Sequence, residues 1–133
     1  MKILDFGTSK FIEESPRNKT YTIIGTPHYM APEIIVGKGY SYTIDLWAVG
    51  VMLYEFMGGE LPYGEDLESP FDIYREIYAR NVSFPTYFQD KDAKRLILIL
   101  LSKVPEVRLG ASYAVLKANK WFQDFDWVLI KIK

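Results

Sequence analysis

The sequence predicts a mainly α-helical domain built around one buried central helix, and three observations support this fold class. Residues 43–57 are mostly apolar in every direction around a helix, which is typical of a helix buried on all sides. At about 1.5 Å per residue this helix would span roughly 22 Å, which is short for a membrane crossing, and it carries Asp45 and Glu55. Amphipathic helical segments follow it in the sequence.

The length and composition of the chain indicate a single globular domain. Its 133 residues suffice for one core that buries about two-thirds of the surface of the unfolded chain. A hydrophobic share of 49% beside 25% charged residues is typical of a soluble protein. Ten Tyr and eight Phe indicate a bulky core.

Charge and residue usage argue against several classes of protein. A net charge of −1 argues against a nucleic-acid-binding or membrane-surface protein. The sequence has no cysteine, which excludes a disulfide framework or a thiolate metal site and fits a reducing, cytoplasmic compartment. A single histidine, His28, argues against a histidine metal cluster or a Ser-His-Asp triad. We expect no signal peptide, because only Ile3 and Leu4 separate Lys2 from Asp5.

The N-terminal third predicts little regular structure. Residues 2–4 form a short apolar run that predicts the end of a strand. Residues 8–21 are polar and lack a hydrophobic period, so we expect a mobile loop. Residues 30–35 restore the apolar content and predict one helical turn, and the Gly58-Gly59 pair predicts a C-cap for the central helix.

Three further helices are predicted downstream. Ser69 and Pro70 predict the start of a peripheral helix whose apolar face carries Phe71, Tyr74, Ile77 and Tyr78. A second amphipathic helix should begin near Asp90 and stop at Pro105, and a last one should cover residues 112–120.

Two short motifs carry the chemical information. Asp5-Phe6-Gly7 precedes Ala31-Pro32-Glu33, and a 23-residue polar loop containing threonine separates them. Each tripeptide recurs by chance, but their order and spacing are those of protein kinases, in which the phosphorylated loop lies between the two motifs. Together with Asp45, Trp47 and Arg108, they make the chain resemble the C-terminal lobe of a eukaryotic Ser/Thr protein kinase.

The resemblance runs over residues 3–129 and is to the AGC group of kinases. The segment 22–33, Thr-Ile-Ile-Gly-Thr-Pro-His-Tyr-Met-Ala-Pro-Glu, is similar to that group, and Phe84-Pro85 and Trp121-Phe122 support it. Within the group the chain most resembles the cyclic-nucleotide-dependent kinases, particularly the protozoan-type cyclic-GMP-dependent branch, where a histidine at the position of His28 is familiar.

This resemblance implies a division of the chain. Residues 1–133 would be part of a kinase domain, with the Asp-Phe-Gly motif and activation segment at 5–33. The helical C-lobe would occupy 34–129 and a C-terminal tail would start at 130–133. The N-lobe would be absent.

The resemblance also implies roles for residues of the activation segment. Asp5 matches the Mg²⁺ ligand that serves ATP, although a turn residue would explain a lone Asp there. Thr22 matches the phosphorylation site, and Lys10 matches one of the cations that pair with the phosphate. The alternative interpretation is that the threonine is an ordinary loop residue. Thr26 matches the threonine that contacts the catalytic base and positions the substrate hydroxyl.

The helical part carries the other implied roles. Glu33 and Arg108 match a buried ion pair with Trp47 packed over it. Asp45 matches the acceptor of hydrogen bonds from the catalytic-loop backbone, although the helix dipole alone would favour an acid there.

Glu55 matches the acceptor for a substrate arginine just before the phosphorylated residue, braced by Tyr29, which implies a basic peptide substrate. Further acids follow without any Lys or Arg between them, and a solvated loop explains most of these five: Glu60, Glu65, Asp66, Glu68 and Asp72.

The sequence departs from the family pattern in two ways. An acid is usual where His28 stands, which puts part of the basic-substrate preference in doubt. A Gly-rich phosphate loop, a strand lysine and a His-Arg-Asp catalytic loop do not occur in these 133 residues, so the chain alone is expected to be inactive. We also expect apolar surface that an oligomer contact would cover.

Two functional hypotheses remain open at this point. The parent protein is either a phosphate-gated Ser/Thr kinase, with cyclic-nucleotide control from a regulatory domain elsewhere, or a pseudokinase that uses this lobe to dock other proteins. Asp5, Thr22, Thr26 and Glu55 favour the first hypothesis, because a docking lobe has no need of a metal ligand.

Overall fold

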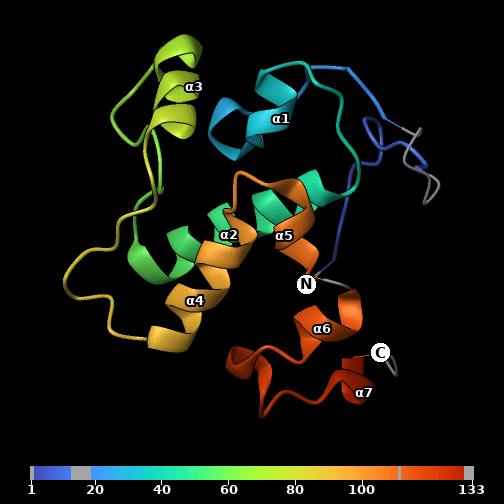
Figure 1. The fold of residues 1–133 in the computed structure, drawn as a ribbon, viewed down its shortest axis with the longest axis vertical. Coiled ribbons are helices and arrows are strands. Elements are labelled where there is room, and N and C mark those ends of the chain that lie inside the picture. The colour runs from blue at the N-terminus through green and yellow to red at the C-terminus, as the bar shows by residue number, and fades with distance from the viewer. Residues whose placement is uncertain (1, 13–18, 111, 131–133) are drawn as a thin grey trace.

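The computed structural model describes residues 2–12, 19–110 and 112–130, and the fold of these residues is helical, without a β-strand (Figure 1). One isolated antiparallel bridge joins Thr20 to Tyr40. The elements follow in the order η1 (Pro27–Tyr29), α1 (Pro32–Ile35), α2 (Thr43–Gly58), α3 (Pro70–Ala79), α4 (Lys91–Leu100), α5 (Pro105–Leu109), α6 (Tyr113–Lys117), η2 (Lys120–Phe122) and α7 (Trp127–Ile130).

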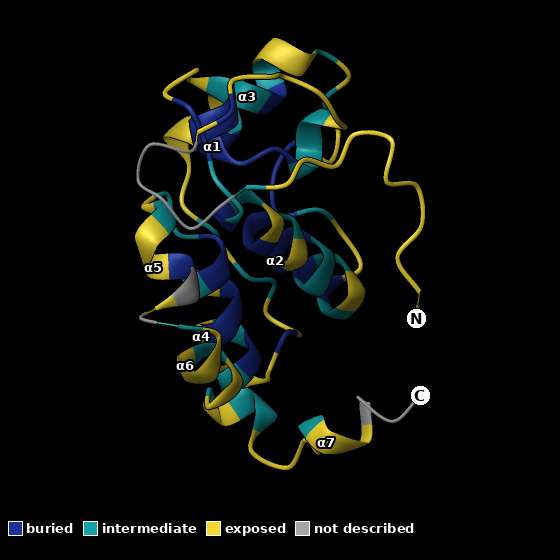
Figure 2. Cartoon of the chain, turned by 90° about the vertical axis from the view of Figure 1, so that its right-hand side faces the viewer, coloured by how far each residue is buried: buried dark blue, intermediate teal, exposed yellow. Residues whose placement is uncertain are grey.

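Helix α2 is the predicted central helix, and α4 and α5 pack against it (Figure 1). Its buried face carries Trp47, Val51 and Tyr54. The prediction that this helix is buried on all sides was wrong, because Val49 and Phe56 are 49% and 73% exposed. Figure 2 shows exposed and buried stretches side by side on α2. The helix therefore anchors the core on one face and presents an apolar strip on the other.

Two helix ends form as their local signals predicted. Gly59 adopts a left-handed conformation with φ of 78° and its N–H donates to the Glu55 carbonyl at 2.8 Å, which ends α2. Asp90 begins α4, because its Oδ1 accepts the N–H groups of Asp92 and Ala93 at 2.9 Å. Both signals are local, so they depend little on the surrounding fold.

The predicted end of α4 and the predicted strand were wrong. Helix α4 ends at Leu100, and Pro105 begins α5 instead, where a proline at the first helical position loses no hydrogen bond. Residues 2–4 are exposed and form no strand, since no described segment pairs with them. The predicted loop at 8–21 and the predicted tail at 130–133 lie partly outside the described residues, which omit 13–18 and 131–133.

The apolar face predicted for α3 was right for Tyr74 and Ile77 and wrong for Phe71 and Tyr78. Ile73 and Ile77 are buried, whereas Phe71 and Tyr78 are 80% and 64% exposed. Residues four apart share one side of a helix, and the fold turns the isoleucine side toward the core. Tyr74 is half-buried beside them.

The last predicted helix is split into two elements. Helix α6 ends at Lys117, and the side chain of Asn119 accepts the Trp121 N–H at 3.0 Å, which starts η2 as a separate turn. None of the helices in the described part of the chain combines the length and the apolar content that a membrane crossing needs.

We predict that Gly50→Ala destabilises the fold by about 1–3 kcal/mol, although alanine ordinarily stabilises a helix interior relative to glycine by about 1 kcal/mol. A Cβ atom at this position would lie 2.8 Å from Leu100 Cβ and 2.9 Å from Leu101 Cδ2, so α2 and α4 would have to separate. Urea unfolding measures the change in free energy.

Gly58→Ala is the matched control in the same helix. Its Cβ would lie 3.4 Å from the nearest ring carbon of Tyr54, which is an ordinary contact, so stability should stay level or rise slightly. A Gly50→Ala protein as stable as the wild type would contradict the close packing of α2 on α4.

Candidate functional site

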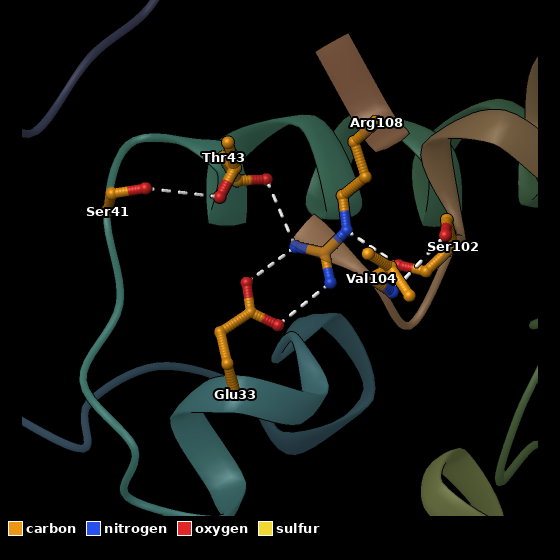
Figure 3. Close-up of polar contacts among 6 residues, drawn as sticks. All are labelled: Glu33, Ser41, Thr43, Ser102, Val104 and Arg108. Atoms are coloured by element: carbon orange, nitrogen blue, oxygen red, sulfur yellow. Dashed lines mark hydrogen bonds and ion pairs between the residues drawn. The ribbon is translucent and has the colours of Figure 1, made fainter. Parts of the chain in front are cut away.

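A buried ion pair joins Glu33 to Arg108. Glu33 lies in the first turn of α1 and Arg108 in the last turn of α5. Arg108 Nη1 donates to Glu33 Oε1 at 2.6 Å and Nη2 to Oε2 at 2.8 Å, so the contact is bidentate (Figure 3). The Arg108 residue is 0% exposed and the Glu33 residue 9%. The structure therefore brings together two residues that are 75 positions apart.

The same guanidinium reaches two backbone carbonyls. Arg108 Nε donates to the Ser102 carbonyl at 2.8 Å and Nη1 to the Thr43 carbonyl at 3.3 Å (Figure 3). Arg108 Cζ lies 5.0 Å from the centre of the Trp47 ring, which adds a cation–π contact. One side chain thus connects α1, the start of α2 and the segment before α5.

Trp47 also stacks on Tyr63. The two ring centres are 5.9 Å apart and the ring planes differ by 7°. Burial raises the pKa of Tyr63 to about 12, because the tyrosinate anion is disfavoured away from water. Trp47 Nε1 is buried and has no hydrogen-bond partner among the described residues.

A second polar contact joins η1 to α2. The hydroxyl of Tyr29 donates to Glu55 Oε2 at 2.7 Å, and both side chains are half-buried. The hydrogen bond to Glu55, followed by burial and the charges of Glu55 and Glu65, raises the pKa of Tyr29. No Lys or Arg pairs with Glu55 in the described ranges, so this carboxylate has a hydroxyl partner and no cation.

The activation-segment residues predicted from the sequence lie in the exposed N-terminal part. Asp5 is exposed with φ of 61°, and its Oδ1 accepts the Gly7 N–H at 3.2 Å. Thr22 and Lys10 are exposed, and no described hydrogen bond or ion pair joins their side chains. The Thr22 carbonyl accepts the hydroxyl of Tyr40 at 2.6 Å.

Two further predicted residues have exposed positions. Thr26 precedes η1 and its side chain makes no capping hydrogen bond. Asp45 lies in the first turn of α2, where the surrounding protein partly desolvates the carboxylate and raises its pKa. The structure therefore groups Glu33, Arg108 and Trp47, and separately Tyr29 and Glu55, while Thr26 and Asp45 stand apart.

Comparison with known proteins assigns the family. The model of the protein kinase domain matches residues 1–122. The chain belongs to the protein kinase family. It is 49% identical to a cGMP-dependent protein kinase of Eimeria tenella and 48% identical to one of Toxoplasma gondii, each over 130 residues and 96% of the chain. It is 41% identical to a cAMP-dependent protein kinase catalytic subunit of Dictyostelium discoideum, again over 96% of the chain.

These relatives are much longer than the chain. The aligned segment covers 13% of each of the two cGMP-dependent kinases and 19% of the Dictyostelium subunit. The helical fold of the described residues agrees with the predicted C-lobe of a kinase.

Protein kinases in general use ATP and Mg²⁺. The exposed Asp5 fits one part of such a site, because a carboxylate oxygen is the ligand that a hard divalent cation prefers. The described residues hold no cluster of three or more metal-ligating side chains. In protein kinases, oxygens of the nucleotide phosphates supply further ligands of the ion.

Sequence reasoning missed two contacts of the kinase segment. His28 Nε2 lies 3.2 Å from the Gly64 carbonyl, and the Tyr40 hydroxyl binds the Thr22 carbonyl. Each contact joins a side chain to a backbone oxygen far along the chain, for which residue spacing gives no signal. The structure shows that Gly64 has a positive φ of 70°, which favours glycine, but a glycine in a loop does not indicate which side chain contacts it.

We predict that the free energy of unfolding falls by up to about 2–3 kcal/mol as the pH rises from about 10 to about 12. An unfolded tyrosine ionises near pH 10, whereas Tyr63 keeps its proton to about pH 12 in the folded chain, so the folded state is disfavoured in this window. Tyr63→Phe removes the ionisable hydroxyl, so this variant should lose less stability than the wild type between pH of about 10 and about 12. Urea unfolding at several pH values in this range measures the difference.

Tyr113→Phe is the control, because this exposed substitution leaves Tyr63 in place. It should keep the wild-type pH dependence. The burial of the Tyr63 hydroxyl would be contradicted if Tyr63→Phe and the wild type lost stability equally.

Proposed function

We propose that this chain is the substrate-binding and activation-segment part of a Ser/Thr protein kinase that transfers the γ-phosphate of ATP to basic protein substrates. The contact between Tyr29 and Glu55 carries the proposal. A half-buried carboxylate that has no cation partner among the described residues is a suitable acceptor for a substrate arginine, which would supply charge-assisted hydrogen bonds. Tyr29 orients this carboxylate by donating to Oε2.

The exposed N-terminal residues take the remaining roles in this proposal. Asp5 holds Mg²⁺, and Thr26 positions the substrate hydroxyl. Phosphate on Thr22 recruits cations to the activation segment, with Lys10 as one of them. The exposure of Thr22 supports this role, because a modifying enzyme must reach its hydroxyl.

The residues after the activation segment form the rest of the proposed kinase lobe. Residues 34–129 form the helical C-lobe and 130–133 begin a tail. Asp45 accepts hydrogen bonds from a catalytic-loop backbone, which an exposed acid at the start of α2 is free to do.

Cyclic GMP is the proposed regulator. The support is the identity of 47–49% to three cGMP-dependent protein kinases, against 41% to the cAMP-dependent subunit. We place the protein in the cytoplasm because the sequence contains no cysteine.

The test uses a full-length kinase polypeptide that contains this chain together with the ATP-binding lobe and the regulatory domain. We predict that Glu55→Gln lowers kcat/KM for an arginine-containing peptide by about 10–100-fold, since a hydrogen bond to a charged group contributes roughly 1.5–3 kcal/mol. The same peptide with alanine in place of arginine should lose far less. The assay is phosphate transfer with and without cyclic GMP.

Glu106→Gln is the charge-matched control, because Glu106 is exposed on α5. It should leave kcat/KM unchanged, and the 133-residue chain alone should transfer no phosphate. An equal loss on both peptides with Glu55→Gln would contradict the assignment of Glu55. A wild-type polypeptide that binds peptides without phosphate transfer would favour a pseudokinase.

A further inference from the structure

The loop between α2 and α3, residues 60–69, is fixed to η1 by a histidine. His28 is half-buried and its Nε2 lies 3.2 Å from the Gly64 carbonyl. A carbonyl oxygen only accepts hydrogen bonds, so the ring nitrogen is the donor. This contact joins η1 to the loop after α2, although the two residues are 36 positions apart in the sequence.

Gly64 is held on its other sides as well. Its N–H donates to Glu76 Oε2 of α3 at 3.3 Å, and its carbonyl also accepts the Leu67 N–H at 3.0 Å. With φ of 70°, an added Cβ atom would lie 3.0 Å from Ile73 Cγ1 and 3.3 Å from His28 Cδ2. The loop at Gly64 therefore has little freedom while His28 keeps its hydrogen bond.

The residue after Gly64 is an acid close to the proposed peptide site. Glu65 Oε2 accepts the Leu61 N–H at 2.6 Å, which fixes the side chain within the loop. The negative charge of Glu65 acts on the Tyr29 hydroxyl together with that of Glu55, and both raise the pKa of Tyr29. His28 and Tyr29 are adjacent in η1, so their contacts with Gly64 and Glu55 bring the loop that carries Glu65 and the part of α2 that carries Glu55 to the same short element.

We propose that His28 is a positioning residue for substrate specificity, which holds Gly64 and thereby places Glu65 as a second acceptor, beside Glu55, for basic side chains of the peptide. The inference rests on the proposed function and adds to it a second carboxylate and the residue that positions it. Glu65 is exposed and is paired with no Lys or Arg in the described ranges, so it is available to a peptide. Arginine suits this place, since a guanidinium has five N–H donors and a carboxylate offers two acceptor oxygens.

Two substitutions of His28 test the positioning role. Glutamine places an amide N–H near the position of Nε2, whereas asparagine is one carbon shorter and does not reach Gly64. In the kinase polypeptide, His28→Asn should raise KM for an arginine-containing peptide about threefold or more, with kcat and KM for ATP unchanged. His28→Gln should restore the wild-type KM.

A double-mutant cycle then asks whether His28 acts through Glu65. Glu65→Gln is a substitution of an exposed side chain and should raise the same KM. If His28 positions Glu65, then His28→Asn should add little to a protein that already carries Glu65→Gln. Peptides with alanine in place of arginine should show neither effect, and Glu106→Gln should behave as the wild type.

Several results would overturn the inference while the proposed function stands. These are a wild-type KM in Glu65→Gln, additive effects in the double variant, or a His28→Gln protein as impaired as His28→Asn. Thermal unfolding checks that each variant is folded, and the Glu65→Gln result decides the matter if His28→Asn unfolds. A wild-type polypeptide without phosphate transfer would instead overturn the proposed function, and this inference with it.

Discussion

A guanidinium that is shielded from water and bound on three sides connects the distant parts of this chain. Arg108 donates two hydrogen bonds to Glu33 and one each to the Ser102 and Thr43 carbonyls, with the Trp47 ring beside it. A buried charge is tolerated only when its partner and its remaining hydrogen bonds are in place. The segment that carries Glu33 is therefore fixed relative to α2, although α1 itself is only one turn long.

This constraint sets the position of the residues just before α1. Only two residues separate η1 from α1, so the pair at Glu33 holds His28 and Tyr29 close to α2 and to the loop after it. There Tyr29 meets Glu55 and His28 meets Gly64. Asp5 and Thr22 are more distant from the pair in sequence and are exposed. The molecule thus combines a fixed side, where we propose that the peptide binds, with an exposed N-terminal segment that carries the proposed phosphorylation site.

The sequence predicted what local chemistry controls. The central helix, its glycine C-cap and the Asp90 N-cap follow from apolar content and capping residues within a few positions. The buried face of α3 did not follow, because Phe71 and Ile73 are both apolar and only the surrounding fold decides which one turns inward. The contact of His28 with Gly64 left no local pattern, since a backbone carbonyl is present at every residue. Family motifs suggested Glu33 and Arg108, whereas the orientation of their side chains required the structure.

The most direct test of this account is a double-mutant cycle on the ion pair, with Glu33→Leu, Arg108→Met and the combined variant compared by urea unfolding. Each single substitution should cost about 3–5 kcal/mol, because it leaves one buried charge without its partner. The combined variant should cost roughly 2 kcal/mol or more less than their sum, since no charge is then left unpaired. Strictly additive costs would contradict the claim that the contact between Glu33 and Arg108 holds this part of the chain together.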